Sequence, residues 1–180
     1  MNYGNIKYCD IANGEGVRTS LFVSGCTHHC AGCFQPETWD FSYGEEFGDA
    51  QQEAIIESLD HDWIDGLSVL GGEPMEPENQ AGLAPFLARV KQRFPAKMIW
   101  VYTGDVLEDL IDGPRRTAAT ESLLSSIDVL VDGPFQEDKK DITLRFCGSS
   151  NQRIIDVPKT LQAGSIVLWR DDPLFQKHTL

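Results

Sequence analysis

The chain has 180 residues, of which 41% are hydrophobic, and a formal net charge of −13 at pH 7. This length favours one domain, residues 1–180, that buries its core without disulfide bonds. The apolar runs "IVLW" and "MIWV" are far shorter than the ~20 residues of a membrane span. Because the 15 Lys and Arg residues are scattered, the negative charge argues against nucleic-acid binding.

The amino-terminal sequence "MNYGNIKYCDIANGEG" has neither the basic nor the apolar region of a secretory signal. We therefore expect a cytoplasmic protein, in a compartment where thiols stay reduced. The cysteines are five in number and three of them are clustered, which argues against a disulfide framework because disulfides need pairs. Metal ligation explains the cluster better.

Short apolar segments and helical patterns alternate along the chain. Strands are predicted at residues 19–24, 67–70, 98–102 and 127–131. A capping box of Asp49 and Gln52 predicts one helix start, and Asn79 predicts the next. Pro85 lies inside this second helix, so a later start or a kink is expected there. A third helix is predicted over residues 120–127.

This alternation is typical of an α/β fold with a parallel sheet covered by helices. The chain is too short for a full eight-unit barrel, so four to six parallel strands in an open or partial barrel are expected. After Gly133 the segments 141–146, 153–157 and 164–169 have the pattern of short strands without helices between them. We expect residues 134–180 to form a terminal extension within the same domain.

Distinctive residues follow each of the four predicted strands, in the sequences "GCTHHCAGCF", "GGEP", "TG" and "DGPF". Ligands of parallel α/β proteins bind at the carboxyl ends of the strands, so these segments are expected to converge on one rim.

Cys26, Cys30 and Cys33 form the pattern C-x3-C-x2-C. A structural zinc site would need His28 or His29 as a fourth ligand in the same short loop, and a redox pair would leave Cys26 without a role. Three thiolates can instead hold three irons of a 4Fe-4S cluster and leave the fourth iron open. The two histidines are then expected to shape access to the loop or to donate hydrogen bonds to cluster sulfurs.

The segment "GGEP" suggests what the open iron binds. Gly71 and Gly72 permit a close approach to the backbone, and Glu73 supplies a carboxylate that can accept from an ammonium group. Two glycines and a proline often form an ordinary turn, so the functional interpretation of "GGEP" depends on the position of this segment after a predicted strand. An amino-acid-like cofactor fits an ammonium acceptor beside an open iron.

With Phe34 after the third cysteine and "GGE" after the second strand, the sequence resembles radical S-adenosylmethionine enzymes. The segments "NGEGVRTSLFVSGCTHHCAGCFQPETW", "LSVLGGEPM", "IWVYTG", "DVLVDGPF" and "GSSNQRIIDVP" are similar, in order, to the anaerobic ribonucleoside-triphosphate reductase-activating family. The resemblance covers nearly the whole chain. It implies the partial barrel of that superfamily and an oxidoreductase that activates a glycyl radical enzyme.

Carried over from the family, Cys26, Cys30 and Cys33 would ligate a 4Fe-4S cluster whose open iron chelates S-adenosylmethionine. Backbone groups of Gly32, Cys33 and Phe34 would line this cofactor, and Gly71, Gly72 and Glu73 would hold its methionine end. Thr103 and Asp132 resemble positions that contribute to cofactor or cation binding in related activases. No side chain need act as general acid or base, so no separate catalytic residue is expected.

The resemblance also implies a reaction and its partners. Reduced flavodoxin or ferredoxin would supply an electron, cleavage of S-adenosylmethionine would give a 5′-deoxyadenosyl radical, and this radical would take a hydrogen atom from a glycine of the reductase large subunit. Two residues depart from the family pattern: Cys147 stands where arginine is usual and Gln35 where asparagine is commoner. The alternatives are an activase of another glycyl radical enzyme, a small radical S-adenosylmethionine synthase, and a zinc-binding interaction module.

Overall fold

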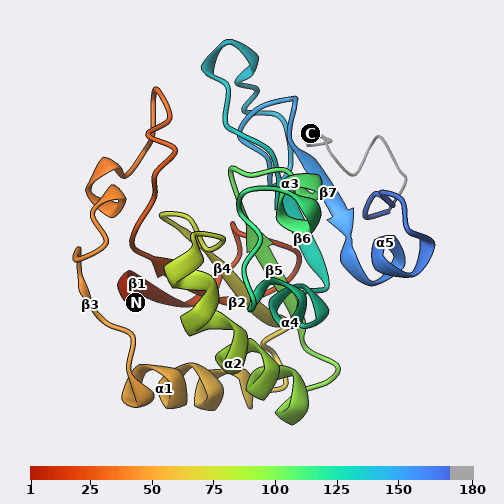
Figure 1. The fold of residues 1–180 in the computed structure, drawn as a ribbon. Helices are drawn as coiled ribbons and strands as arrows, with labels where there is room; N and C mark the ends of the chain where they lie inside the picture. Colours follow the sequence, from red (N-terminus) through yellow and green to blue (C-terminus); the bar gives the residue numbers. More distant parts are fainter. Residues whose placement is uncertain (171–180) are drawn as a thin grey trace.

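The structure is a computed structural model that describes residues 1–170. Within these residues, a seven-stranded sheet has the order β3-β1-β2-β4-β5-β6-β7 (Figure 1). The central strands β2 (Arg18–Val23), β4 (Gly66–Gly71), β5 (Met98–Tyr102) and β6 (Val129–Asp132) are parallel. The four predicted strands are therefore confirmed, each to within two residues.

Antiparallel strands flank this parallel centre. β1 (Asn2–Asp10) pairs with β2, and the two-residue β3 (Glu45–Glu46) pairs with β1. At the other edge β7 (Arg153–Asp156) pairs with β6. The fold is thus a mixed α/β sheet, and the all-parallel arrangement expected from the sequence is wrong at both edges. β1 was not anticipated because none of its residues is fully buried and its apolar residues do not alternate regularly.

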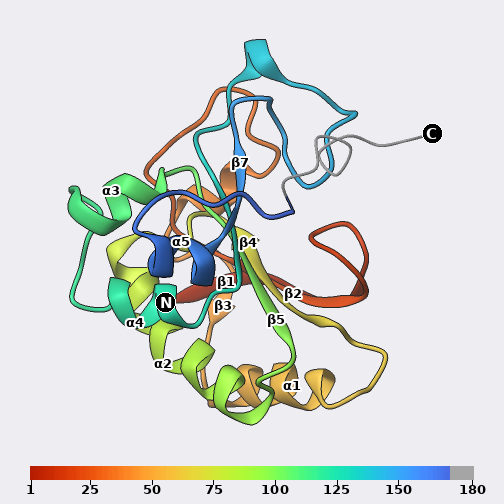
Figure 2. The same ribbon diagram turned by 90° about the vertical axis from the view of Figure 1, so that its right-hand side faces the viewer.

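Helices cover one face of the sheet, as Figures 1 and 2 show for α2 and α4. The connections contain α1 (Asp49–Leu59), α2 (Pro77–Arg93), α3 (Leu107–Asp112) and α4 (Thr120–Ser125), and α5 (Val157–Ala163) follows β7. Alternate strand residues face the helices, because side chains of a strand point to opposite sides in turn. Fully buried Leu21, Val69 and Val101 belong to the same core as Leu83 and Leu87 of α2.

The other face of the sheet carries a buried cation beside an aromatic ring. The Arg18 guanidinium donates to Ser68 Oγ (2.7 Å) and to the carbonyl oxygens of Leu67 (2.8 Å) and Met98 (2.6 Å). It lies 5.6 Å from the ring centroid of Trp100. Tyr102 follows two residues later on the same face and lines the cavity described below. Arg18 and Trp100 therefore belong to the packed base beneath that cavity.

The predicted helices form, but two of their starts differ. The N-cap of α1 is Gly48 rather than Asp49, and no side chain caps it. α2 begins at Pro77 and continues through Pro85, so the later start is wrong. A proline fits the first turn of a helix, where its missing N–H has no partner to lose, and Pro85 lies on the exposed side. The third predicted helix is confirmed as α4.

The region after Gly133 is only partly as expected. The predicted strand 153–157 is confirmed as β7, which joins the main sheet. Residues 141–146 instead form turns, in which Asp141 Oδ1 accepts from the amide and hydroxyl of Thr143. Residues 164–169 contribute one isolated bridge, between Leu168 and Ile155. The last part of the predicted extension, 171–180, lies outside the described residues.

Two long segments rise at one end of the sheet in both views, the orange one after β2 and the cyan one after β6 (Figures 1 and 2). Both follow the carboxyl ends of parallel strands, where ligands of α/β proteins bind. Among the described helices, none has both the length and the apolar character needed to cross a bilayer.

Candidate functional site

A cavity of about 520 Å³ lies at the carboxyl ends of the parallel strands. The residues expected to hold the cluster and the methionine end of its cofactor all line it: Cys26, Cys30, Gly32, Cys33, Phe34, Gly71, Gly72 and Glu73. Their convergence follows from the topology, because β2 and β4 are parallel neighbours and end at the same edge. We call residues 25–34, 71–76 and 103–105 the cysteine wall, and residues 133–152 the second wall.

The three clustered cysteines are free thiols that share this cavity. The amide of Gly25 donates to Thr38 O (2.8 Å) and that of Cys26 to Trp39 O (3.2 Å), which ties the start of their loop to the following short helix. Burial raises the pKa of the Cys26 thiol to about 11. A cysteine that binds a metal does so as a thiolate, and the positive charge of a bound metal would stabilise the thiolate that burial disfavours here.

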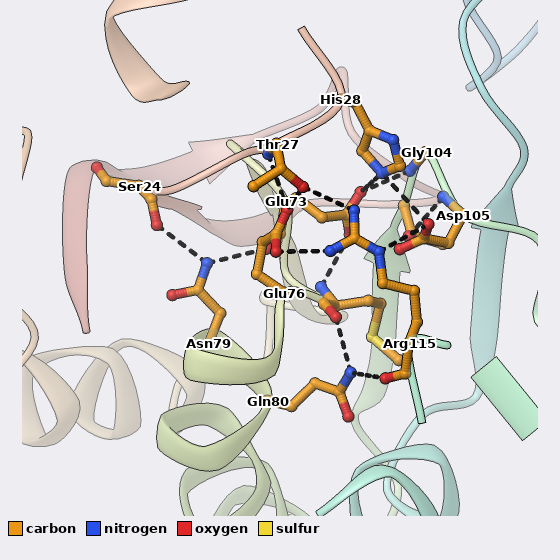
Figure 3. Close-up of polar contacts among 12 residues, drawn as sticks. Ser24, Thr27, His28, Glu73, Glu76, Asn79, Gln80, Gly104, Asp105 and Arg115 are labelled. Carbon is orange, nitrogen blue, oxygen red and sulfur yellow. Dashed lines mark hydrogen bonds and ion pairs between the residues drawn. The ribbon is translucent and has the colours of Figure 1, made fainter. Parts of the chain in front are cut away.

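Hydrogen bonds of Thr27 hold the cysteine loop in place (Figure 3). Its amide and its hydroxyl both donate to Glu76 Oε1, at 2.8 and 2.6 Å. Arg115 donates to Glu76 Oε2 (2.6 Å) and to Thr27 Oγ1 (2.8 Å). Glu76 is buried, so this charged network is partly shielded from water. It joins three segments that lie far apart in the sequence.

Glu73 presents a buried carboxylate, which is 1% exposed. Its Oε1 accepts from the amide of Met75 and its Oε2 from the amide of Gly104, each at 2.8 Å. The turn before it needs glycine, because Gly71 has a φ of +110° and a Cβ there would lie 2.8 Å from the backbone of Val23. The carboxylate is therefore oriented by the backbone on both oxygens.

His28 points toward this carboxylate (Figure 3). Its Nε2 lies 3.0 Å from Glu73 Oε2 and 3.5 Å from Asp105 Oδ1. The carboxylates of Asp105 and Glu73 raise the pKa of His28 to about 10, so the imidazole is charged at neutral pH. The second histidine, His29, instead stacks on Trp39 with ring centroids 4.5 Å apart. The two histidines thus have different surroundings, which the sequence did not distinguish.

The second wall contributes Phe135, Leu144, Phe146, Cys147 and Gln152 to the cavity. Burial raises the pKa of the Cys147 thiol to about 11, so it is neutral at physiological pH. On the adjoining strand β5, the buried hydroxyl of Tyr102 has no hydrogen-bond partner within the described residues.

Thr103 and Asp132 differ in their relation to the cavity. Thr103 lines it, and its hydroxyl accepts from the amide of Asp105 at 3.0 Å. Asp132 is fully buried and is not a lining residue. Its carboxylate accepts from Arg153 Nε (2.9 Å) and from the amide of Leu107 (2.8 Å). These contacts connect β6, β7 and α3, which gives Asp132 a structural role here.

Sequence reasoning missed several members of the site. Asp105 follows the third strand directly after "TG", so its position was a usable signal. Glu76 lies three residues beyond the "GGE" glutamate and Arg115 lies in a loop before α4, and neither belongs to a recognisable motif. Their role depends on tertiary contacts that no local pattern encodes.

The family model described as a 4Fe-4S single cluster domain matches residues 12–155. An anaerobic ribonucleoside-triphosphate reductase-activating protein of Pasteurella multocida is 43% identical over 156 residues, which are 86% of this chain and 96% of the relative. A protein of the same name from Haemophilus influenzae is 44% identical, and the match includes 86% of this chain and 97% of the relative. For the protein of that name from Escherichia coli K12 the identity is 41%, over 84% of this chain and 96% of the relative.

The chain belongs to the anaerobic ribonucleoside-triphosphate reductase-activating protein family. The 4Fe-4S match of this family member begins in the loop before β2 and ends in β7, so it includes both walls of the cavity. Three free cysteines in one cavity are a donor set that suits such a cluster. A zinc module, by contrast, would need a fourth ligand beside them.

Proposed function

We propose that the protein is an iron–sulfur enzyme that cleaves S-adenosylmethionine reductively and generates a glycyl radical on the anaerobic ribonucleoside-triphosphate reductase. The observation that carries the proposal is the presence of three free cysteines and the buried carboxylate of Glu73 in one cavity. Family membership favours the anaerobic reductase as the partner. It argues against an activase of another glycyl radical enzyme and against a small synthase.

In this proposal Cys26, Cys30 and Cys33 hold three irons of a 4Fe-4S cluster, and the fourth iron is left for the cofactor. The fit is supported by the donor chemistry, because the three thiols are unpaired and their loop is anchored at both Gly25 and Thr27. Anchoring matters because a ligand loop that is ordered beforehand loses less entropy on binding metal.

Glu73 binds the ammonium group of the cofactor, beside the backbone of Gly71 and Gly72. The backbone of Gly32, Cys33 and Phe34 lines the remaining part of the cofactor site. When bound, the cluster and S-adenosylmethionine together supply a 5′-deoxyadenosyl radical, after one-electron reduction by flavodoxin or ferredoxin. The chain itself binds and orients these groups and excludes water, and none of its side chains has to transfer a proton.

A protein substrate is supported by the apolar rim of the cavity. The most exposed large hydrophobic side chains of residues 1–170 are Ile142 (84%), Phe34 (81%) and Ile11 (75%). Phe34 lines the cavity, Ile11 adjoins the lining residue Ala12, and Ile142 lies two residues before the lining residue Leu144. Exposed apolar residues around a pocket are typical of interaction sites. The rim would receive the glycine-bearing segment of the reductase.

The proposed architecture is a single domain, residues 1–180, with an open partial barrel of the radical S-adenosylmethionine type. Its support is the row of four parallel strands with helices on one face and the cavity at their carboxyl ends. A cytoplasmic location belongs to the same proposal, since the cluster thiols have to stay reduced.

The test is an anaerobic reconstitution with iron and sulfide, followed by reduction and measurement of 5′-deoxyadenosine released from S-adenosylmethionine. The reductase large subunit is then added and the electron paramagnetic resonance spectrum recorded. Cleavage together with a glycyl radical signal is expected. Tightly bound zinc with no cleavage would overturn the enzyme assignment, and cleavage without a radical on the reductase would overturn the partner.

One rim variant and one matched control test the partner surface. Ile142→Ser is expected to lower the radical yield at limiting reductase, because it removes apolar surface at the rim. The control is Trp63→Ser, which changes an exposed aromatic residue that does not line the cavity. Equal effects of the two variants would contradict the proposed rim.

A further inference from the structure

The carboxylate proposed to bind the cofactor's ammonium group is already in contact with a side chain of the cysteine loop. His28 Nε2 lies 3.0 Å from Glu73 Oε2, and both residues line the cavity. We propose that His28 occupies the ammonium position of Glu73 and turns to Asp105 when the cofactor binds. This inference rests on the proposed function and assigns a positioning role to two further residues, His28 and Asp105.

The contact between His28 and Glu73 is close but poorly directed. His28 Nε2 is buried, and its geometry satisfies no hydrogen bond within the described residues, although Glu73 Oε2 is 3.0 Å away. Glu73 does not depend on it, because its two oxygens accept from the amides of Met75 and Gly104. An ammonium group, which carries three donors, can therefore replace the imidazole without leaving the carboxylate unpaired.

Asp105 offers His28 a second position. Its Oδ1 is 3.5 Å from His28 Nε2 and accepts from Arg115 Nε at 3.2 Å. Its Oδ2 is buried and has no partner among the described residues. A buried acceptor without a partner is costly, so a donor that moves toward it is stabilised. The ion pair with Arg115 meanwhile holds the Asp105 side chain in place.

The exchange requires a side-chain rotation rather than a loop movement. Thr27, the residue before His28, is held by two hydrogen bonds to Glu76 and one from Arg115. Space for the imidazole comes from Gly104, where a Cβ would lie 2.9 Å from His28 Cδ2. Any larger residue at position 104 would therefore restrict rotation of the ring.

The measurable consequence concerns affinity. Displacing His28 from Glu73 costs free energy that is subtracted from cofactor binding, and the Asp105 position offsets part of this cost. Removing His28 should strengthen cofactor binding. Removing the charge of Asp105 should weaken binding, but only while His28 is present. A purely structural role of either residue predicts no such dependence of one on the other.

The experiment is equilibrium dialysis of labelled S-adenosylmethionine against the reconstituted, unreduced protein, with iron and sulfide content measured for each variant. His28→Ala is expected to lower the dissociation constant by a factor between about two and five, the value of a weakly directed ion pair. His29→Ala, which loses only the stacking on Trp39, should leave it unchanged. Binding of 5′-methylthioadenosine, which lacks the ammonium group, should not respond to His28→Ala.

The double variant decides the mechanism. Asp105→Asn should raise the dissociation constant in the wild-type background and leave it unchanged in the His28→Ala background. Unchanged or weaker binding by a His28→Ala protein with full cluster content would overturn the inference, as would equal effects of Asp105→Asn in both backgrounds. If His28→Ala loses its cluster, Asp105→Asn alone still tests the inference, because unaltered binding contradicts it. No binding by the wild type would instead overturn the proposed function.

Discussion

The two walls of the cavity are held together in different ways. In the cysteine wall, Thr27 bonds to Glu76 and to Arg115, which lie 49 and 88 residues further along the chain. In the second wall, Gln152 bonds to the amide of Gly148 and to the carbonyl of Gly133, which are 4 and 19 residues away. The geometry of the cysteine wall therefore depends on the whole fold, whereas the second wall is set by nearby residues.

This difference indicates how each wall tolerates change. A wall built from long-range contacts forms only when the sheet and α2 are in place, so it is suited to hold metal ligands at fixed positions. A locally built wall can vary without disturbing the core. The second wall accordingly contains the exposed Ile142 and also Cys147, at a position where the family resemblance leads us to expect arginine.

The largest expected effect separates the cysteines of the two walls. Replacing Cys26, Cys30 or Cys33 with alanine should abolish cluster binding and turnover, because three thiolates are the minimum that holds the cluster with one open iron. Cys147→Ala and Cys9→Ala should leave the iron content nearly unchanged. Iron and sulfide analysis after reconstitution measures this, and a fully loaded Cys30→Ala protein would contradict the ligand assignment.

Arg115→Ala tests the long-range network of the cysteine wall. It leaves the buried carboxylate of Glu76 without its ion pair at 2.6 Å, and loss of one partner of such a pair costs about 3 kcal/mol. Urea unfolding should show this loss, together with lower cluster content. The matched control is Arg93→Ala, whose partner Asp60 is exposed, and which should change stability by less than about 0.5 kcal/mol. Equal losses of unfolding free energy in the two variants would contradict a stabilising role of the buried network.

Glu73→Gln removes the charge from the cysteine wall with a side chain of nearly the same size, although one of the two backbone hydrogen bonds to it is lost as well. A hydrogen bond to a charged group contributes about 2 kcal/mol, so the dissociation constant of S-adenosylmethionine should rise roughly tenfold to a hundredfold. Cluster content should remain, since Glu73 is not a proposed metal ligand. Glu78→Gln, an exposed change in the first turn of α2, is the control. Unaltered affinity of the Glu73→Gln protein would exclude the assigned role.

The smallest effect concerns the ion pair of Glu108 with Arg153, the residue that follows the second wall in the sequence. Hydrogen bonds from Arg153 lower the pKa of Glu108 to about 2, from an ordinary value of 4.5. Because the folded value is the lower one, the pair stabilises the protein above about pH 4.5 and this contribution disappears as the pH falls toward 2. Glu108 is 57% exposed, so solvent screening limits the contribution to less than about 1 kcal/mol.

Urea unfolding of the wild type and of Glu108→Gln measures that contribution. The difference in unfolding free energy between them should be present at about pH 6 and should shrink by about pH 3. A difference that is constant over this range would show that the ion pair does not account for it.

The sequence predicted the centre of the fold better than its edges. Strands such as 98–102 are short apolar runs bounded by turn residues, and that pattern determines them locally. β1 and α5 gave weaker signals, because no residue of β1 is fully buried and α5 has only 7 residues. The start of α5 was nevertheless marked by Asp156, which caps it by accepting from the amide of Lys159, and by Pro158 in its first turn. The segment 141–146 has apolar residues at alternate positions, yet Asp141 bonds to Thr143 and stabilises a turn.

The same distinction applies to the site. The spacing of the cysteines and the glycines of "GGE" could be read directly, and all these residues line the cavity. Arg115 could not be placed, because its significance depends on its contact with Glu76, which lies 39 residues before it. The place of Asp105 directly after "TG" was a usable signal, but its approach to His28 depends on the fold. Motifs identify the groups that meet a ligand, whereas the groups that support them are determined by the fold.

Asn79 has a consequence for how the two ligand-bearing segments move. Its side-chain amide, buried in the first turn of α2, donates to Ser24 O and to Glu73 O, both at 2.9 Å. One planar group therefore spans the ends of two neighbouring strands, just before the first cysteine and at the ammonium acceptor. Both segments are hydrogen-bonded to one rigid amide, which limits their movement relative to each other and helps to keep the cysteine loop and the Glu73 carboxylate at a fixed separation.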